Sequence, residues 1–172
     1  LKKIKSWKYP YSLGLLYSAI TQRIGLKPNE DEYITMGMAA FGEPIHNLED
    51  QLWKNNHKGV GNIFPKARSE DLAASVQDLY ERELLKLVEM CPHENLVIMG
   101  GCALNCVANS KITGKNIWIM PAPGDAGSAL GAAALVKKQK LEWKSPYLGT
   151  PIFNPVNVKS VVQELLDNKV CG

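Results

Sequence analysis

The stretch that decides the fold is residues 96–134, LVIMGGCALNCVANSKITGKNIWIMPAPGDAGSALGAAA. It predicts two apolar strands, at 96–99 and 117–120, each followed by a glycine turn. Each turn opens directly into a helix, at about 103–112 and about 126–139. Strand and helix in strict alternation favour a layered α/β architecture with parallel neighbouring strands.

The two glycine turns predict a site for an anionic ligand. Each turn brings backbone N–H groups and a helix N-terminus into one crevice, which suits phosphate. Glycines also let a ligand lie against the backbone, because no Cβ stands in the way. The tandem pair therefore predicts a nucleotide site, whose candidate binding residues are Gly100, Gly101, Asn105, Asn109, Gly124, Gly127 and Ser128.

Several of these residues have a structural alternative. Asn105 and Asn109, four apart on one helix face, could bind ribose or phosphate oxygens, or could cap a helix and face solvent. Asp125 is either a helix N-cap or a ligand to a metal held near phosphates. Gly127 and Gly131 leave a helix face with little side-chain volume, which suits either close packing or close approach of a ligand.

The remainder of the chain predicts helices at 13–25, ending at Gly25, and from Ser69 to about Met90. Between them, TMGMAAFGEP at 35–44 packs small residues tightly, and VGNIF at 60–64 has the composition of a strand.

Beyond Lys140 the chain becomes polar and rich in proline. We expect a domain over 1–144, and over 145–172 a linker or tail that leads to a following domain and holds a short helix at about 158–168. The chain opens mid-pattern and without an initiator Met, which suggests a segment of a longer protein.

Composition excludes several classes of function. Among 172 residues with a net charge of +3, basic residues are scattered, so we expect no nucleic-acid partner. No run of about 18 apolar residues occurs, so no membrane span is expected. The four cysteines form no CxxC pair, which predicts small buried thiols in a reducing cytoplasm. Walker, GxGxxG, HExxH and GxSxG motifs are missing.

Four ordered blocks carry a family resemblance: PYSLGLLYSAIT at 10–21, YITMGMAAFGEP at 33–44, GGCALNCVAN at 100–109 and PAPGDAGSALGAA at 121–133. Together they resemble the O-carbamoyltransferases that modify antibiotics and nodulation factors, relatives of the tRNA threonylcarbamoyl-transferring enzymes. SPYLGT, at 145–150, is similar to the segment that closes this domain of the family.

The resemblance implies the C-terminal half of a catalytic domain, namely a ribonuclease-H-like half of an actin-like, sugar-kinase-like ATPase fold with a mixed sheet flanked by helices. Such enzymes use ATP and carbamoyl phosphate to form carbamoyl-adenylate, then transfer the carbamoyl group to a hydroxyl of a small-molecule acceptor. By position, Gly100, Gly101 and Asn105 match the family's nucleotide loop, and Asp125 matches a ligand of a divalent metal, for which iron is expected.

The metal's histidine ligands would lie in the family's N-terminal half, which with an adenylate-forming domain is missing from these 172 residues. We therefore expect the fragment to be inactive alone. Tyr11 and Ile34 depart from the family pattern. Two alternatives remain open: a sugar or carboxylate kinase of the same fold, and a non-catalytic nucleotide-binding module.

Overall fold

The computed structural model describes residues 3–139, together with Gln163 and Asp167. The chain divides into two compact units, Leu1–Gln139 and Lys140–Gly172. The predicted linker or tail, including the SPYLGT segment and the final helix, lies outside the described residues apart from Gln163 and Asp167. No helix in the described part of the chain is both long enough and apolar enough to cross a membrane.

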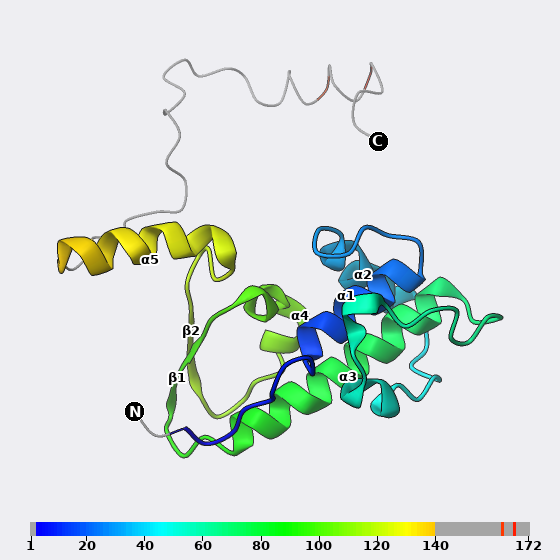
Figure 1. The fold of residues 1–172 in the computed structure, drawn as a ribbon, viewed down its shortest axis with the longest axis horizontal. Helices are drawn as coiled ribbons and strands as arrows, with labels where there is room; N and C mark the ends of the chain where they lie inside the picture. Colours follow the sequence, from blue (N-terminus) through cyan, green and yellow to red (C-terminus); the bar gives the residue numbers. More distant parts are fainter. Residues whose placement is uncertain (1–2, 140–162, 164–166, 168–172) are drawn as a thin grey trace. The chain divides into compact units, whose positions relative to one another are not determined.

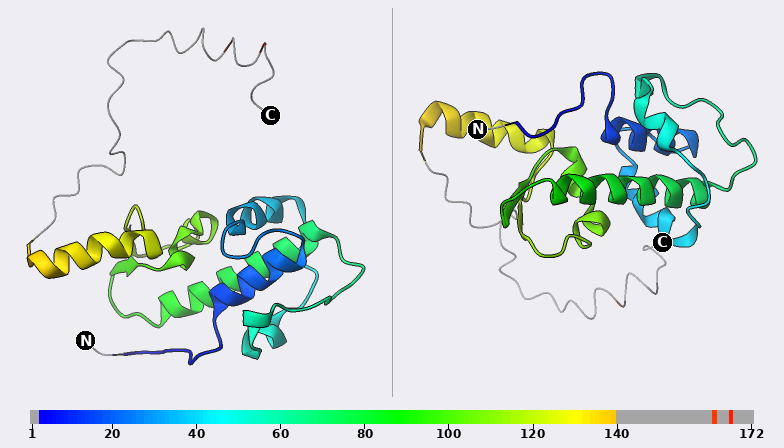
Figure 2. Two further views of the ribbon diagram at one scale, coloured as in Figure 1. Left: turned by 45° about the horizontal axis from the view of Figure 1, so that its top comes forward. Right: turned by 90° about the horizontal axis from the view of Figure 1, so that it is seen from below.

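Three helices form the body of the first unit: α1 (Leu13–Arg23), α2 (Glu32–Met38) and α3 (Ser69–Glu89). Short 3₁₀ helices, η1 (Ala39–Phe41), η2 (Glu49–Trp53) and η3 (Asn56–Lys58), connect them. Figure 1 shows α1 and α2 against one half of the long α3, and both views in Figure 2 agree.

The core lies where α1 crosses α3. Leu16 and Ile20 on α1 meet Leu72, Val76 and Leu79 on α3, and all five side chains are at most 1% exposed. Burying each such side chain contributes roughly 1.5–3 kcal/mol of transfer free energy. The predicted helix from Ser69 to about Met90 is confirmed as α3, and its first half supplies these core residues.

The predicted end of the first helix at Gly25 is confirmed, and the structure adds a cap at its start. Ser12 caps α1, because its hydroxyl accepts a hydrogen bond from the backbone N–H of Leu15 at 3.3 Å. Gly25 follows the helix with φ +90°, the left-handed conformation expected of a C-terminal glycine. The predicted tight packing of the 35–44 segment is confirmed at Gly42. An added Cβ there would lie 2.0 Å from the carbonyl oxygen of Glu70 on α3.

The predicted strand at 60–64 is wrong. This segment is a loop, because Gly59, Gly61 and Phe64 have φ values of +74°, +64° and +46°, which no extended strand accommodates. The loop is tied to α1 instead: the Arg23 guanidinium donates to the carbonyl oxygens of Ile63 at 2.9 Å and Phe64 at 3.0 Å.

After α3, the chain forms β1 (Asn95–Ile98) and β2 (Asn116–Ile119), which pair in parallel with Val97 opposite Trp118. Helix α5 (Asp125–Lys137) follows β2. The two strands, their parallel pairing and α5 confirm the predicted α/β alternation. The expected mixed sheet is not formed by residues 3–139, whose sheet has only these two strands.

The predicted single helix at 103–112 is wrong. The chain instead forms 3₁₀ helix η4 (Gly101–Leu104) and one turn of helix, α4 (Cys106–Asn109). The break lies at Asn105, whose ψ of 84° is not helical and whose side chain caps α4. An asparagine favours such a cap because its oxygen satisfies a free backbone N–H.

One face of the sheet and nearly all of α5 are uncovered. Val97, Met99 and Trp118 are 61%, 60% and 56% exposed, and within α5 only Gly127 is buried. Figure 1 shows the strands and α5 standing beside the helical body. Parallel strands, and helices that are apolar all round, are normally buried on every side.

Candidate functional site

The two glycine turns meet at the carboxyl end of the sheet. The backbone N–H of Gly100 donates to the carbonyl oxygen of Pro123 at 2.8 Å, which joins the turn after β1 to the turn after β2. Gly100 has φ +92°, a conformation that favours glycine. A Cβ added to Gly124 would lie 3.7 Å from the Cα of Gly101, so the turns also pack against each other.

A pocket of about 290 Å³ lies at this junction. It is lined by Met99, Gly100, Met120, Ala122, Pro123, Gly124, Asp125, Gly127, Ser128 and Gly131. Five of the sequence-predicted site residues, from both turns and from α5, are thus brought together around one space. Its volume is close to the lower limit for pockets that hold small ligands.

Asp125 is the first residue of α5, and its capping alternative is wrong. The N-cap position belongs to Gly124, and no side chain caps the helix. The Asp125 side chain is exposed, and its carboxylate is free of hydrogen-bond or ion-pair partners among the described residues. Only its backbone carbonyl is engaged, by the hydroxyl of Ser128. The carboxylate is therefore available to a ligand.

Metal binding by residues 3–139 alone has no ready-made ligand set. Nowhere in the described part of the chain do three or more His, Cys, Asp or Glu side chains cluster closely enough to hold an ion. Asp125 fits as one oxygen ligand for a divalent cation, because a carboxylate is a preferred donor and this one is unpaired. Any further ligands would have to come from other residues.

The glycines of the site divide into two groups. A Cβ on Gly127 would lie 1.9 Å from the carbonyl oxygen of Ala122, so this glycine is required for packing of α5 on the second turn. Gly101 and Gly131 have nothing within 4 Å of a built Cβ. Space beside Gly101 is therefore open to a ligand. Of the two roles that the sequence allowed for Gly127, close packing and close approach of a ligand, the structure supports close packing.

Asn105 and Asn109 lie outside the lining of this pocket. Asn105 accepts a hydrogen bond from the backbone N–H of Ala108 at 2.9 Å, so its capping role is real. Asn109 is 6% exposed and donates to the carbonyl oxygen of Ala103 at 2.8 Å. Both amides thus stabilise the segment between β1 and β2.

Two residues of helix α3 bind the segment that follows the first glycine turn, and sequence reasoning missed both of them. The Tyr80 hydroxyl donates to the carbonyl oxygen of Cys102 at 2.7 Å, and Gln77 pairs with Asn105 through two hydrogen bonds. Burial raises the pKa of the Tyr80 phenol above its ordinary value of 10.0, so it stays a donor. The available signal was a polar Gln77 on the core-facing side of a helix.

The three described cysteines do not meet the expectation of buried residues, and Cys171 lies outside the described residues. Cys91 is half-buried, whereas Cys102 and Cys106 are exposed residues. The sulfur of Cys102 nevertheless packs against α1, since a Cβ added to Gly14 would lie 2.9 Å from it. Desolvation there raises the pKa of the Cys102 thiol, which disfavours a reactive thiolate.

Comparison with known proteins places these features in a family. Residues 2–64 and 55–134 match the family described as "Carbamoyltransferase N-terminus". An uncharacterized protein of Synechocystis is 39% identical, over 78% of this chain and 28% of its own length. Nodulation protein NolNO of Sinorhizobium fredii is 28% identical over 81% of this chain and 25% of its own length.

A further relative is nodulation protein U of Bradyrhizobium diazoefficiens, 34% identical over 59% of this chain and 22% of its own length. The chain therefore spans between about a fifth and a third of the length of these three relatives.

Proposed function

The chain belongs to the carbamoyltransferase family, and from this premise we propose that it is part of a cytoplasmic O-carbamoyltransferase. The enzyme would use water, ATP and carbamoyl phosphate to form carbamoyl-adenylate, with release of inorganic phosphate from carbamoyl phosphate and of pyrophosphate from ATP. It would then transfer the carbamoyl group to a hydroxyl of a small-molecule acceptor, releasing AMP. The fold proposed for the whole domain is the actin-like, sugar-kinase-like ATPase fold.

The observation that carries the proposal is the junction of the two glycine turns. Gly100 follows β1 and Gly124 follows β2, yet they line one pocket with the N-terminus of α5. Backbone N–H groups and a helix N-terminus favour negative charge, as on the phosphates of a nucleotide. The open side of Gly101 gives room for the ligand at the same junction.

Asp125 is the residue of this chain proposed to hold the metal, with iron expected and histidine ligands supplied from outside these 172 residues. When bound, the metal would polarise the carbamoyl carbonyl. The support within this structure is the Asp125 carboxylate at the lining of the pocket, which has no partner within the described part of the chain.

The rest of the protein is proposed to cover the bare side of this unit. In the relatives compared above, more than two thirds of the length lies outside the match. We infer that the other half of the ATPase domain and an adenylate-forming domain complete the site, and that additional strands extend β1 and β2. Exposed Val97 and Trp118 are the support, since parallel sheets are buried on both faces. The chain alone is then inactive.

The decisive experiment does not need the acceptor to be known. Full-length protein is incubated with ATP, labelled pyrophosphate and carbamoyl phosphate. We expect label to enter ATP only when carbamoyl phosphate is present, because adenylate formation is reversible. Formation of ADP from ATP with carbamoyl phosphate unconsumed would indicate a kinase instead. Tight ATP binding without exchange or turnover would indicate a non-catalytic module.

A further inference from the structure

A second pocket, of about 480 Å³, lies beside the first turn of α3. Its walls come from residues 45–46, from residues 64–68 and from Asp71 on α3. It shares no lining residue with the pocket at the glycine turns, so the two pockets are separate. Its volume falls within the range of pockets that bind small molecules.

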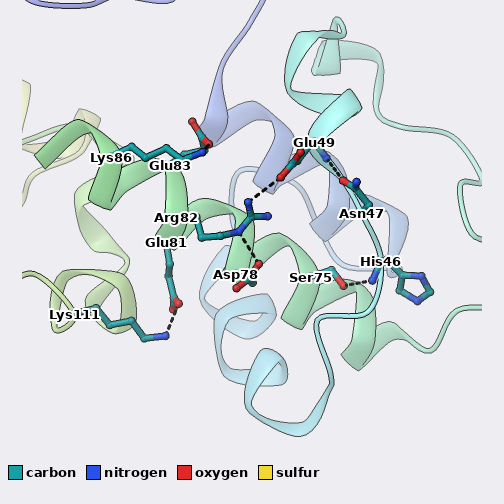
Figure 3. Close-up of polar contacts among 10 residues, drawn as sticks. All are labelled: His46, Asn47, Glu49, Ser75, Asp78, Glu81, Arg82, Glu83, Lys86 and Lys111. Atoms are coloured by element: carbon teal, nitrogen blue, oxygen red, sulfur yellow. Dashed lines mark hydrogen bonds and ion pairs between the residues drawn. The ribbon is translucent and has the colours of Figure 1, made fainter. Parts of the chain in front are cut away.

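The walls of this second pocket are fixed by hydrogen bonds to α1 and α3. The backbone N–H of His46 donates to Ser75 Oγ on α3 at 3.1 Å, a bond drawn in Figure 3. The Arg23 guanidinium on α1 binds the carbonyl oxygens of Ile63 and Phe64. Phe64 has a φ of +46°, which a bulky residue adopts only where its surroundings impose it. Tertiary contacts therefore shape the pocket.

A buried ring nitrogen of this pocket lacks a partner. Nε2 of His46 is shielded from solvent and has no hydrogen-bond partner among the described residues. The Phe64 ring packs on the imidazole, with the ring centroids 4.7 Å apart. Buried polar atoms are nearly always hydrogen-bonded, because an unpaired one has lost its bond to water without a replacement. Phe64 is a partly exposed loop residue, so a ligand that displaces its ring gains access to Nε2.

The charged side chains that line the pocket favour an anion. Lys66 is exposed and has no ion-pair partner within the described part of the chain. Arg68 Nε lies 3.6 Å from Glu70 Oε2 and 3.9 Å from Asp71 Oδ2, and both distances are too long for hydrogen bonds. Asp71 already accepts a hydrogen bond at Oδ1, from the backbone N–H of Glu43 at 3.0 Å. Two cationic side chains thus keep their donors available beside one carboxylate that is partly engaged.

We propose that this pocket binds a small organic anion, whose phosphate or carboxylate lies at Lys66 and Arg68 and whose planar apolar part packs against His46 and Phe64. A guanidinium offers either oxyanion two parallel N–H donors, and the neighbouring ammonium adds a second positive charge. His46 Nε2 gains its missing partner from a polar atom of the ligand. The proposal is independent of the proposed function, because the glycine turns contribute nothing to this pocket.

Saturation-transfer NMR on the full-length protein tests the proposal with three probes: phenyl phosphate, benzoate and uncharged benzyl alcohol. We expect the ring protons of at least one anion to receive saturation, with a Kd of about 1–5 mM for a probe of this size. Tighter binding of phenyl phosphate would identify a phosphate ligand, and tighter binding of benzoate a carboxylate. If benzyl alcohol binds as tightly as both anions, or if none of the three probes binds, the proposal is wrong.

Variants of the lining locate the bound probe. Arg68→Met should weaken anion binding about tenfold at low salt, the value of one hydrogen bond between charged groups. His46→Phe keeps a ring against Phe64 and should also weaken binding, with Tm no lower than wild type because an unpaired buried nitrogen is removed.

Lys54→Met is the matched control, because Lys54 is an exposed lysine outside the lining, and it should leave the affinity unchanged. Arg68 and Lys66 are exposed, so Arg68→Met and Lys66→Met should both fold, which a thermal melt verifies. If these two variants bind the anion as tightly as Lys54→Met does, the probe lies elsewhere and the proposal is overturned.

Discussion

Gly127→Ala is the substitution whose cost the structure determines most directly. The added methyl carbon would lie 1.9 Å from the carbonyl oxygen of Ala122 and 3.1 Å from its carbonyl carbon. Ordinary carbon–oxygen contacts begin at about 3.3 Å, so one of the two backbones must move by about 1.4 Å. A flexible side chain cannot relieve this clash, because the obstructing atoms are backbone.

The magnitude follows from two opposing terms. Overpacking of this kind costs roughly 1–3 kcal/mol or more. Replacing glycine by alanine in a helix contributes up to about 1 kcal/mol in the other direction. We therefore expect a net loss of about 1–2 kcal/mol in the free energy of unfolding for Gly127→Ala. Gly131→Ala, one turn later on α5 with no atom within 4 Å of its Cβ, should be neutral or stabilising.

Urea denaturation of both variants in the full-length protein measures the difference, and ATP titration adds a functional readout. Ala122 and Gly127 both line the pocket, so the displaced backbone should also weaken nucleotide binding in the Gly127 variant. Equal stability of the two alanine variants would show that α5 does not pack closely on the second glycine turn, and the described geometry of the pocket would be refuted.

Three further predictions concern the site and the core. Asp125→Asn should abolish metal binding and pyrophosphate exchange and leave Tm nearly unchanged, because the Asp125 side chain caps no helix. Wild-type metal content by elemental analysis would refute its ligand role. Gly101→Val should lower ATP affinity more than it lowers stability, because the space beside Gly101 is open and its φ is not positive. Calorimetric titration measures the affinity and a thermal melt measures the stability. Unchanged ATP affinity would show that the turn has a structural role only. Burial raises the pKa of Tyr17 and Tyr80 above 10.0, so the unfolded chain loses these protons first and the free energy of unfolding should fall only as pH rises beyond about 10. Tyr80→Phe should reduce that fall in alkaline denaturation, and an unchanged pH profile would count against its burial.

The sequence by itself determined the elements whose cause is local. Helix α1 begins after Ser12 and ends before Gly25, because a capping hydroxyl and a left-handed glycine act on neighbouring backbone groups. The two strands and α5 follow from apolar runs punctuated by glycine turns, and their parallel pairing follows from the alternation of strand and helix. The family resemblance rested on four local blocks, two of which hold these glycine turns, and it is confirmed.

Tertiary structure decided what depends on residues far apart in the chain. Gln77 meets Asn105 across 28 positions, so no local pattern could show that the predicted helix at 103–112 is divided there by an anchored cap. Composition made 60–64 resemble a strand, but no strand of the described residues pairs with it, and the chain turns through left-handed conformations instead.

The same distinction holds inside the candidate site. Sequence assigned Gly101 and Gly127 alike to the nucleotide site, and Asp125 beside them either to a helix cap or to a metal. The fold separates them physically: the carbonyl of Ala122 fills the space beside Gly127, whereas Gly101 borders open space. The Asp125 carboxylate has no hydrogen-bond or ion-pair partner among the described residues. Steric contact between two backbones is a property of their distance in space, and residue type alone does not specify that distance.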